Sequence, residues 1–293
     1  MTSIDNTLQG LQVRGLSRLE AQRLLLHVLQ RPDHDRAWLL AHGSEALDTS
    51  AHARLENLVL GYLDGQPMAY LLGHQAFYGL DLVVDPRVLV PRPDTEALVD
   101  WALEVLAPCP AASIIDLGTG SGAIALALKA TRTDLHVSAL DFSEEALTVA
   151  RSNAEHLHLS VSFRQGSWLA GVPEQFQAIV SNPPYIAMQD QHLAALVHEP
   201  LSALASGVDG LDDIRTIIRQ APERLMSGGW LLLEHGYDQA VAVRALLQTA
   251  GFAQVQSHQD LAGIERCSGG QWQPGGDVTT PDLKHSLGVL ARG

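Results

Sequence analysis

The sequence predicts an α/β protein: a doubly wound, mostly parallel, Rossmann-like sheet of seven strands, preceded by a small helical domain. From residue 111 onward, short apolar runs alternate with amphipathic stretches, which is typical of a parallel sheet with helices on both faces. A glycine-rich segment at 118–122 separates the first of these strands from a helix. Before residue 76, apolar residues recur at helical spacing instead. The 293 residues are enough for two domains of ordinary size.

Residues 1–75 predict a bundle of short helices. Ser17 and Glu20 have the spacing of a capping box ahead of an apolar stretch. Asp35 is placed to cap a short helix, and a longer one is expected to begin at Thr49 or the next residue. Helices this short are marginal alone, so they must bury their apolar faces on one another or on another domain.

Residues 76–95 are expected to link the two domains. Two short runs of strand-forming residues, 75–79 and 80–84, meet at Gly79 and predict a β-hairpin. Pro93 lies near the start of the next helix, a position that suits its fixed φ and missing N–H.

Residues 96–273 are expected to form the sheet domain. Strands are expected at 113–116, 136–141, 161–163, 178–181, 230–234, 253–257 and 266–272. Helices are expected at 93–106, 123–130, 144–156, 211–226 and 239–250. Residues 274–293 are rich in Gly, Pro and Thr and have little periodicity, which predicts a disordered tail.

The charge balance disfavours a nucleic-acid partner. The chain carries 19 Lys and Arg against 33 Asp and Glu, a net charge of −14, and no run of cationic residues. Tight binding to DNA or RNA needs several cationic contacts to phosphates. An acidic surface of this kind mainly favours solubility.

Cysteine use and the absence of hydrophobic spans predict a cytoplasmic protein. Cys109 and Cys267 lie far apart and form neither a disulfide framework nor a zinc pattern. We find no signal peptide at the N-terminus and no apolar stretch long enough to cross a membrane. His156 and His158 have no accompanying carboxylate or cysteine pair, so we expect no metal site.

The segment Asp116–Gly122 predicts a ligand-binding turn between a strand and a helix. Its glycines permit positive φ and close approach of a ligand to the backbone. The spacing of Gly118, Gly120 and Ala123 also fits the dinucleotide fingerprint, and a tight turn without a ligand is a further interpretation. Asp141 ends the next strand, where its carboxylate could accept bonds from ribose hydroxyls or cap the following helix.

The segment Asn182-Pro183-Pro184-Tyr185 predicts a site for a planar nitrogen group. The two prolines stop the preceding strand at the edge of the sheet where ligands bind. The Asn182 side-chain oxygen and the Pro183 carbonyl can accept both N–H groups of an amide or aromatic amine, and Tyr185 can pack on its plane. Such a clamp favours a methyltransferase over a dehydrogenase.

Two further positions leave alternatives open. Glu234 and the adjacent histidine, at the end of a strand, could line the pocket or pack at the sheet edge. Arg92 lies in the interdomain segment and could form a structural salt bridge or contact a partner.

The motifs, taken in order, resemble the HemK/PrmC family of class I S-adenosylmethionine-dependent methyltransferases, which act on the N5 of a glutamine in peptide chain release factors. The segments that carry the resemblance are Gly65-Gln-Pro-Met-Ala-Tyr-Leu-Leu-Gly73, Val90-Pro-Arg-Pro-Asp-Thr-Glu96, Asp116–Gly122, Asn182–Tyr185, Glu199-Pro200 with Ala203-Leu204, and Leu231-Leu-Leu-Glu-His-Gly236. The resemblance covers about residues 10–272.

The resemblance implies a role for each matching residue. The cofactor's amino-acid moiety would lie against Gly118, Thr119, Gly120, Ser121 and Gly122. Asp141 would bind its ribose and Trp168 its adenine, while Asn182 would contact both the methyl-donor region and the target amide. Pro183, Pro184 and Tyr185 would complete the target site. The helical domain and hairpin would hold the release factor, whose glutamine lies in a Gly-Gly-Gln loop.

The chain also departs from the family pattern. Ser167 stands where an acidic residue often precedes the tryptophan, which puts the contact to the adenine amino group in question. Ile264 replaces a common asparagine, and no arginine lies just before Glu199. The alternatives are an N6-adenine methyltransferase, a ribosomal-protein glutamine methyltransferase and a non-catalytic module that binds a nucleoside or a translation partner.

Overall fold

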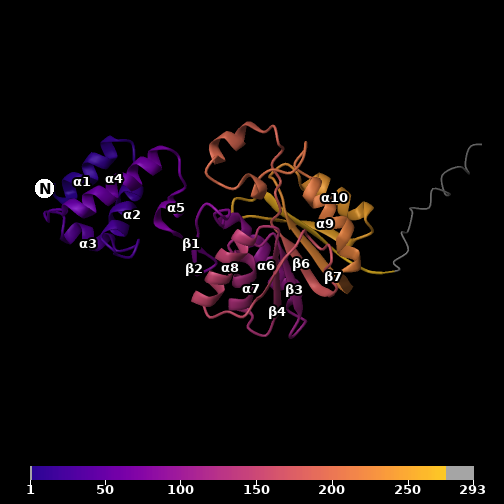
Figure 1. The fold of residues 1–293 in the computed structure, drawn as a ribbon. Coiled ribbons are helices and arrows are strands. Elements are labelled where there is room, and N and C mark those ends of the chain that lie inside the picture. The colour runs from indigo at the N-terminus through magenta and orange to yellow at the C-terminus, as the bar shows by residue number, and fades with distance from the viewer. Residues whose placement is uncertain (1, 275–293) are drawn as a thin grey trace, which may run out of the picture.

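The structure, a computed structural model, describes residues 2–274 and consists of a helical part, a β-hairpin and an α/β part (Figure 1). Apart from Pro274, the expected disordered tail lies outside the described residues. Within the described range, no helix has the length and apolarity that a membrane crossing requires.

The N-terminal part is helical, as expected. Its helices are α1 (Ile4–Val13), α2 (Arg18–Val28), α3 (Arg36–Ala41), α4 (Thr49–Leu63) and α5 (Met68–Leu72). The capping box of Ser17 and Glu20 is present at the start of α2, Asp35 caps α3, and α4 begins at Thr49. The helices bury one shared cluster of side chains, including Leu24, Leu25 and Leu55, which is how short helices become stable.

A hairpin joins this part to the sheet, as the sequence predicts. Strands β1 (His74–Phe77) and β2 (Leu80–Val83) pair antiparallel across a two-residue turn. Tyr78 and Gly79 in that turn both have positive φ, at 49° and 76°, as a type I′ turn requires. The Asn153 side chain bonds both the N–H and the carbonyl of Val83, so the hairpin is tied to the α/β part.

The sheet has seven strands in the order β5-β4-β3-β6-β7-β9-β8, and β9 alone runs opposite to the other six. The strands are β3 (Ser113–Leu117), β4 (His136–Asp141), β5 (Ser162–Gln165), β6 (Phe176–Ser181), β7 (Leu225–Glu234), β8 (Ala253–Gln259) and β9 (Glu265–Gln271). The helices are α6 (Glu96–Leu106), α7 (Ala123–Thr131), α8 (Glu144–His156), α9 (Asp212–Gln220) and α10 (Ala240–Thr249). The predicted fold class is confirmed.

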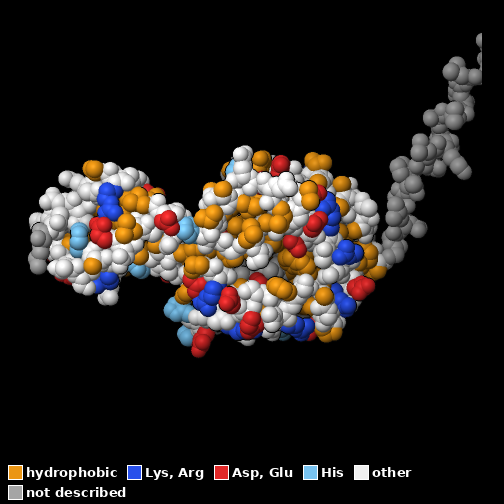
Figure 2. Space-filling view, turned by 45° about the horizontal axis from the view of Figure 1, so that its top comes forward, with side chains coloured by type: hydrophobic (Ala, Val, Ile, Leu, Met, Phe, Trp, Pro, Cys, Tyr) orange, Lys and Arg blue, Asp and Glu red, His pale blue; other side chains and the backbone are white. Residues whose placement is uncertain are grey.

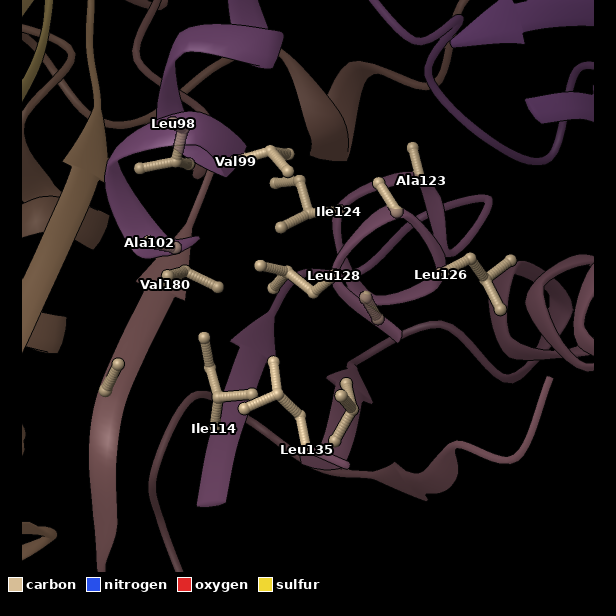
Figure 3. Close-up of a cluster of buried hydrophobic side chains, with 14 of the residues drawn as sticks. Leu98, Val99, Ala102, Ile114, Ala123, Ile124, Leu126, Leu128, Leu135 and Val180 are labelled. Carbon is tan, nitrogen blue, oxygen red and sulfur yellow. The ribbon is translucent and has the colours of Figure 1, made fainter. Parts of the chain in front are cut away.

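Helices cover both faces of the sheet and bury two apolar layers. Ile114 of β3 joins the layer formed with α6 and α7, which Figure 3 shows around Leu128 and Val180. The next residue, Ile115, joins the opposite layer with α9 and α10. Successive side chains of a strand point to opposite faces, so the apolar run of β3 serves both layers.

Two expected boundaries are wrong. The helix expected at 211–226 ends at Gln220, because Pro222 has no N–H to continue it and a 3₁₀ turn follows. Strand β7 begins at Leu225, five residues before the expected start, because the glycines at 228 and 229 conceal its strand pattern. The helix expected from Pro93 begins as a 3₁₀ turn, Pro93–Thr95, before α6.

Arg92 forms a salt bridge with Glu199, which confirms the first of its two interpretations, a structural salt bridge. The Glu199 side chain is only 2% exposed, and its second oxygen accepts a bond from the Val90 N–H. The pair joins the linker to the loop that follows β6.

We expect Glu199→Ala to lower the free energy of unfolding by about 1–3 kcal/mol, because it leaves a buried N–H and a guanidinium without their acceptor. Arg164 and Glu174, each about half exposed, form a matched surface pair. Glu174→Ala is expected to cost less than about 1 kcal/mol. Urea denaturation of both variants measures the difference, and equal losses would contradict the structural role of Glu199.

Candidate active site

Four neighbouring strands end in a row at one edge of the sheet, and the predicted site residues follow directly from them. Leu117 of β3 pairs with Leu140 of β4 and with Ser181 of β6. Ser181 pairs in turn with Leu233 of β7. The register therefore sets four groups side by side, in the order Asp141, Gly118, Asn182 and Glu234. This is the carboxyl edge of an open α/β sheet, at the point where the strand order reverses.

The glycine loop after β3 needs glycine for its shape. Gly118, Gly120 and Gly122 have φ of 69°, 56° and 86°. A methyl group on Gly118 would contact the Trp168 ring at 3.4 Å, whereas one on Gly120 would meet no atom within 4 Å. Gly120 thus presents bare backbone to open space.

Asp141 holds this loop in place. One of its carboxylate oxygens accepts from the Gly120 N–H at 2.9 Å, and the other accepts from the Ser143 N–H at 2.9 Å. The Ser143 hydroxyl caps α8, so Asp141 does not fill the capping role. Burial raises the pKa of Asp141, and the bonds from these two N–H groups oppose that rise. Free lone pairs remain on both oxygens for a ligand.

Asp116, the last acidic residue before the loop, is fully buried. It accepts a 2.6 Å hydrogen bond from the Thr119 hydroxyl, while its other oxygen finds no partner among the described residues. Burial raises its pKa to about 7, and the Thr119 bond only partly opposes this. Asp116 therefore stabilises the glycine loop through its hydrogen bond with Thr119.

The raised pKa of Asp116 predicts a pH dependence of stability. The contribution of Asp116 to the free energy of unfolding is fully present below about pH 4, its pKa in the unfolded chain. It is lost as the pH rises through about 7, its pKa in the folded protein. We therefore expect wild type to lose stability relative to Asp116→Asn between pH 5 and pH 8. Urea denaturation at several pH values measures this, and parallel curves for the two proteins would contradict it.

Trp168 lies beside the glycine loop, where the resemblance places the adenine contact. Its indole N–H donates to Asp213 at 3.1 Å, and its ring contacts Gly118. Its backbone has a φ of 50°, which is uncommon for a bulky residue and holds the ring in this position. The adenine contact itself stays a prediction.

The Asn182–Tyr185 segment leaves β6 as a loop. The Ser181 hydroxyl donates to the Leu117 carbonyl, which joins the ends of β6 and β3. The Asn182 amide donates through Nδ2 to the Thr95 hydroxyl at 3.2 Å. Within the described chain, no group donates to the Asn182 side-chain oxygen or to the Pro183 carbonyl. Both acceptors that the sequence assigns to a planar nitrogen group are thus available.

Tyr185 turns toward Glu234 at the end of β7. Its hydroxyl lies 3.4 Å from one Glu234 oxygen, and the other oxygen has no partner within residues 2–274. Burial raises the pKa of Glu234 to about 7. Burial also raises the pKa of Tyr185 above its usual range, so its hydroxyl remains a donor.

Sequence reasoning assigned no site role to Thr95. It is only 4% exposed and lies 87 positions from Asn182. Thr95 lies in the Val90–Glu96 segment, which resembles the corresponding segment of the HemK/PrmC family. Among the described residues, no group of three or more His, Cys, Asp or Glu side chains is placed to hold a metal ion.

Comparison with known families identifies the class. The profile described as "Methyltransferase small domain" matches residues 95–257, which include every residue of the row at the sheet edge. The profile described as "PrmC N-terminal domain" matches residues 5–73, the helical part. Fold, site and profile together define a methyltransferase.

Two relatives extend the similarity over nearly the whole chain. A release factor glutamine methyltransferase of Bordetella pertussis is 48% identical over 87% of this chain and 95% of its own length. One of Pseudomonas aeruginosa is 45% identical over 93% of this chain and 99% of its own. The chain belongs to the PrmC family of release factor glutamine methyltransferases.

A solved structure shares the fold. The methyltransferase from Pyrococcus furiosus has a TM-score of 0.50 and 19% identity, and the match covers 77% of this chain and all of that one. At this identity the likeness concerns the fold alone.

Proposed function

We propose that this protein transfers a methyl group from S-adenosylmethionine to the side-chain amide nitrogen, N5, of the glutamine in the Gly-Gly-Gln loop of peptide chain release factors. Membership of the PrmC family supports this substrate. The observation that carries the proposal is the pair of free acceptors at Asn182 and Pro183, beside a glycine loop and Asp141.

The residues at the sheet edge fit S-adenosylmethionine. Bare backbone at Gly120 leaves room for the amino-acid moiety, and Asp141 retains lone pairs for ribose hydroxyls. The Trp168 ring supplies an apolar face for adenine. When bound, the cofactor supplies an electrophilic methyl on its sulfonium. Thr119, Ser121 and Gly122 complete the loop that would hold it.

An amide nitrogen is a weak nucleophile, since its lone pair is delocalised. Asn182 and Pro183 would accept its two N–H groups and orient the nitrogen toward the methyl group. The same acceptors stabilise positive charge as it develops on the nitrogen. Tyr185 and Pro184 would cover the planar group, and the methylated nitrogen loses its proton to water.

The surface favours a protein over a nucleic acid as substrate. Exposed hydrophobic residues follow the Asn182–Tyr185 segment at Met188, Val197, Leu201 and Val208. In Figure 2, hydrophobic side chains gather on the α/β part, whereas Lys and Arg are scattered among Asp and Glu. With a net charge of −14, this surface lacks the footprint of phosphate binding.

We also propose that residues 1–75 recognise the release factor, that 76–95 link them to the catalytic domain of residues 96–273, and that the protein acts in the cytoplasm, where translation terminates. A recognition domain separate from the catalytic edge suits a large protein substrate.

A radiolabelled-methyl assay against purified release factors tests the proposal. We expect label in the wild-type release factor and none in a variant with Gln→Ala in its Gly-Gly-Gln loop. Label that persists in the variant would exclude the assigned target, and label in neither would exclude the proposed function.

A further inference from the structure

We propose that Thr95 is a positioning residue: its hydroxyl fixes the Asn182 amide so that the side-chain oxygen faces the target nitrogen. The inference rests on the proposed function for its catalytic consequence. It assigns a task to a buried polar residue to which the proposed function gives no contact with the cofactor or the target.

The contact is specific and buried. The Asn182 Nδ2 lies 3.2 Å from the Thr95 hydroxyl oxygen, and Thr95 is 4% exposed. Thr95 ends the 3₁₀ turn Pro93–Thr95, and its own N–H bonds the Arg92 carbonyl. Its backbone is therefore held independently of Asn182, as a residue that orients another must be.

The direction of the hydrogen bond follows from proton count. A threonine hydroxyl has one proton to donate and lone pairs to accept with. In the structure its oxygen faces the Asn182 Nδ2 at 3.2 Å, and an NH₂ group can only donate. The Thr95 oxygen must then accept from Asn182, which presents its NH₂ inward. The Asn182 oxygen consequently faces outward.

The opposite orientation would disable the clamp. With the amide reversed, its NH₂ would face the N–H groups of the target glutamine, and donor would meet donor. Nothing in Asn182 itself favours one orientation, because an amide side chain has nearly the same shape either way. The Thr95 hydroxyl is the one hydrogen-bond partner that the described residues give the Asn182 side chain, so we assign that preference to it.

Thr95→Val keeps the shape of the side chain and removes the acceptor, whereas Thr95→Ser retains the hydroxyl. The chain has four asparagines, so ¹⁵N-asparagine labelling gives four side-chain NH₂ pairs, and Asn182→Asp identifies that of Asn182. We expect Thr95→Val to shift the Asn182 pair and leave the other three in place. In Thr95→Ser, the Asn182 pair is expected at its wild-type position.

The kinetic expectation is a fall in kcat of about tenfold for Thr95→Val, the size of one lost hydrogen bond, with the Kd for S-adenosylmethionine unchanged. Thr95→Ser should stay within about threefold of wild type. The matched control is Thr249→Val, which removes a hydroxyl that bonds the Ala245 carbonyl at the end of α10. It should change neither kcat nor the Asn182 resonances.

An unshifted Asn182 pair in Thr95→Val, or a kcat for Thr95→Ser as low as for Thr95→Val, would overturn the inference. If Thr95→Val fails to fold, Thr95→Ala replaces it, since alanine also removes the hydroxyl and should again shift the Asn182 pair. An unchanged Asn182 pair in that variant would equally overturn it. The resonance needs no substrate, so it decides the inference even if wild type methylates no release factor.

Discussion

Asn182→Ala is expected to reduce kcat about 100-fold or more, while the Kd for S-adenosylmethionine changes little. The substitution removes the side-chain oxygen that would accept from the target amide and stabilise charge on its nitrogen, and groups of this kind contribute about 100- to 1,000-fold. The glycine loop and Asp141, which would hold the cofactor, keep their contacts with each other. Single-turnover kinetics and titration calorimetry measure the two quantities.

Gln248→Ala is the matched control, since Gln248 carries an exposed amide on α10 and its loss should leave both quantities unchanged. A rate for Asn182→Ala near that of wild type would remove Asn182 from the catalytic account. A lost rate accompanied by an equally lost affinity would make Asn182 a cofactor-binding residue only.

Gly120→Ala is expected to weaken S-adenosylmethionine binding about 100-fold, or about 2.8 kcal/mol. The added methyl group would meet no protein atom within 4 Å, so it projects into the space assigned to the cofactor. The positive φ of Gly120 adds a cost to the protein of about 1 kcal/mol, so the protein should still fold. Calorimetry gives the affinity and thermal denaturation gives the stability.

Gly73→Ala separates these two effects. Gly73 also has a positive φ, at 78°, and its added methyl group also meets no atom within 4 Å, but it lies between α5 and β1, away from the sheet edge. Gly73→Ala should lose about as much stability as Gly120→Ala, but it should bind S-adenosylmethionine as tightly as wild type. If both variants bind S-adenosylmethionine as tightly as wild type, the glycine loop is not the cofactor site.

Local patterns in the sequence were sufficient to predict most of the fold. The capping box at Ser17, the hairpin turn at Gly79 and the strand–helix alternation after residue 111 each depend on neighbours in sequence. The β7 boundary was missed where two glycines interrupt the strand pattern, since a glycine contributes no side chain to either face.

The sequence predicted which residues gather at the site but not how they are held. Strand order and register bring Gly118, Asp141 and Asn182 together, and both follow from a doubly wound sheet. The contact between Thr95 and Asn182 joins residues 87 apart, and no local pattern encodes it. The partnership of Arg92 and Glu199, 107 apart, is of the same kind.

We propose that the target nitrogen belongs to a release-factor glutamine, and tandem mass spectrometry of the methylated product shows which residue carries the methyl group. A purified release factor is incubated with this protein and S-adenosylmethionine, then digested and sequenced by fragmentation. We expect one added methyl group, on the side-chain nitrogen of the glutamine in the Gly-Gly-Gln loop. A methyl group on any other residue, or none on a release factor that carries an unmodified loop, would contradict it.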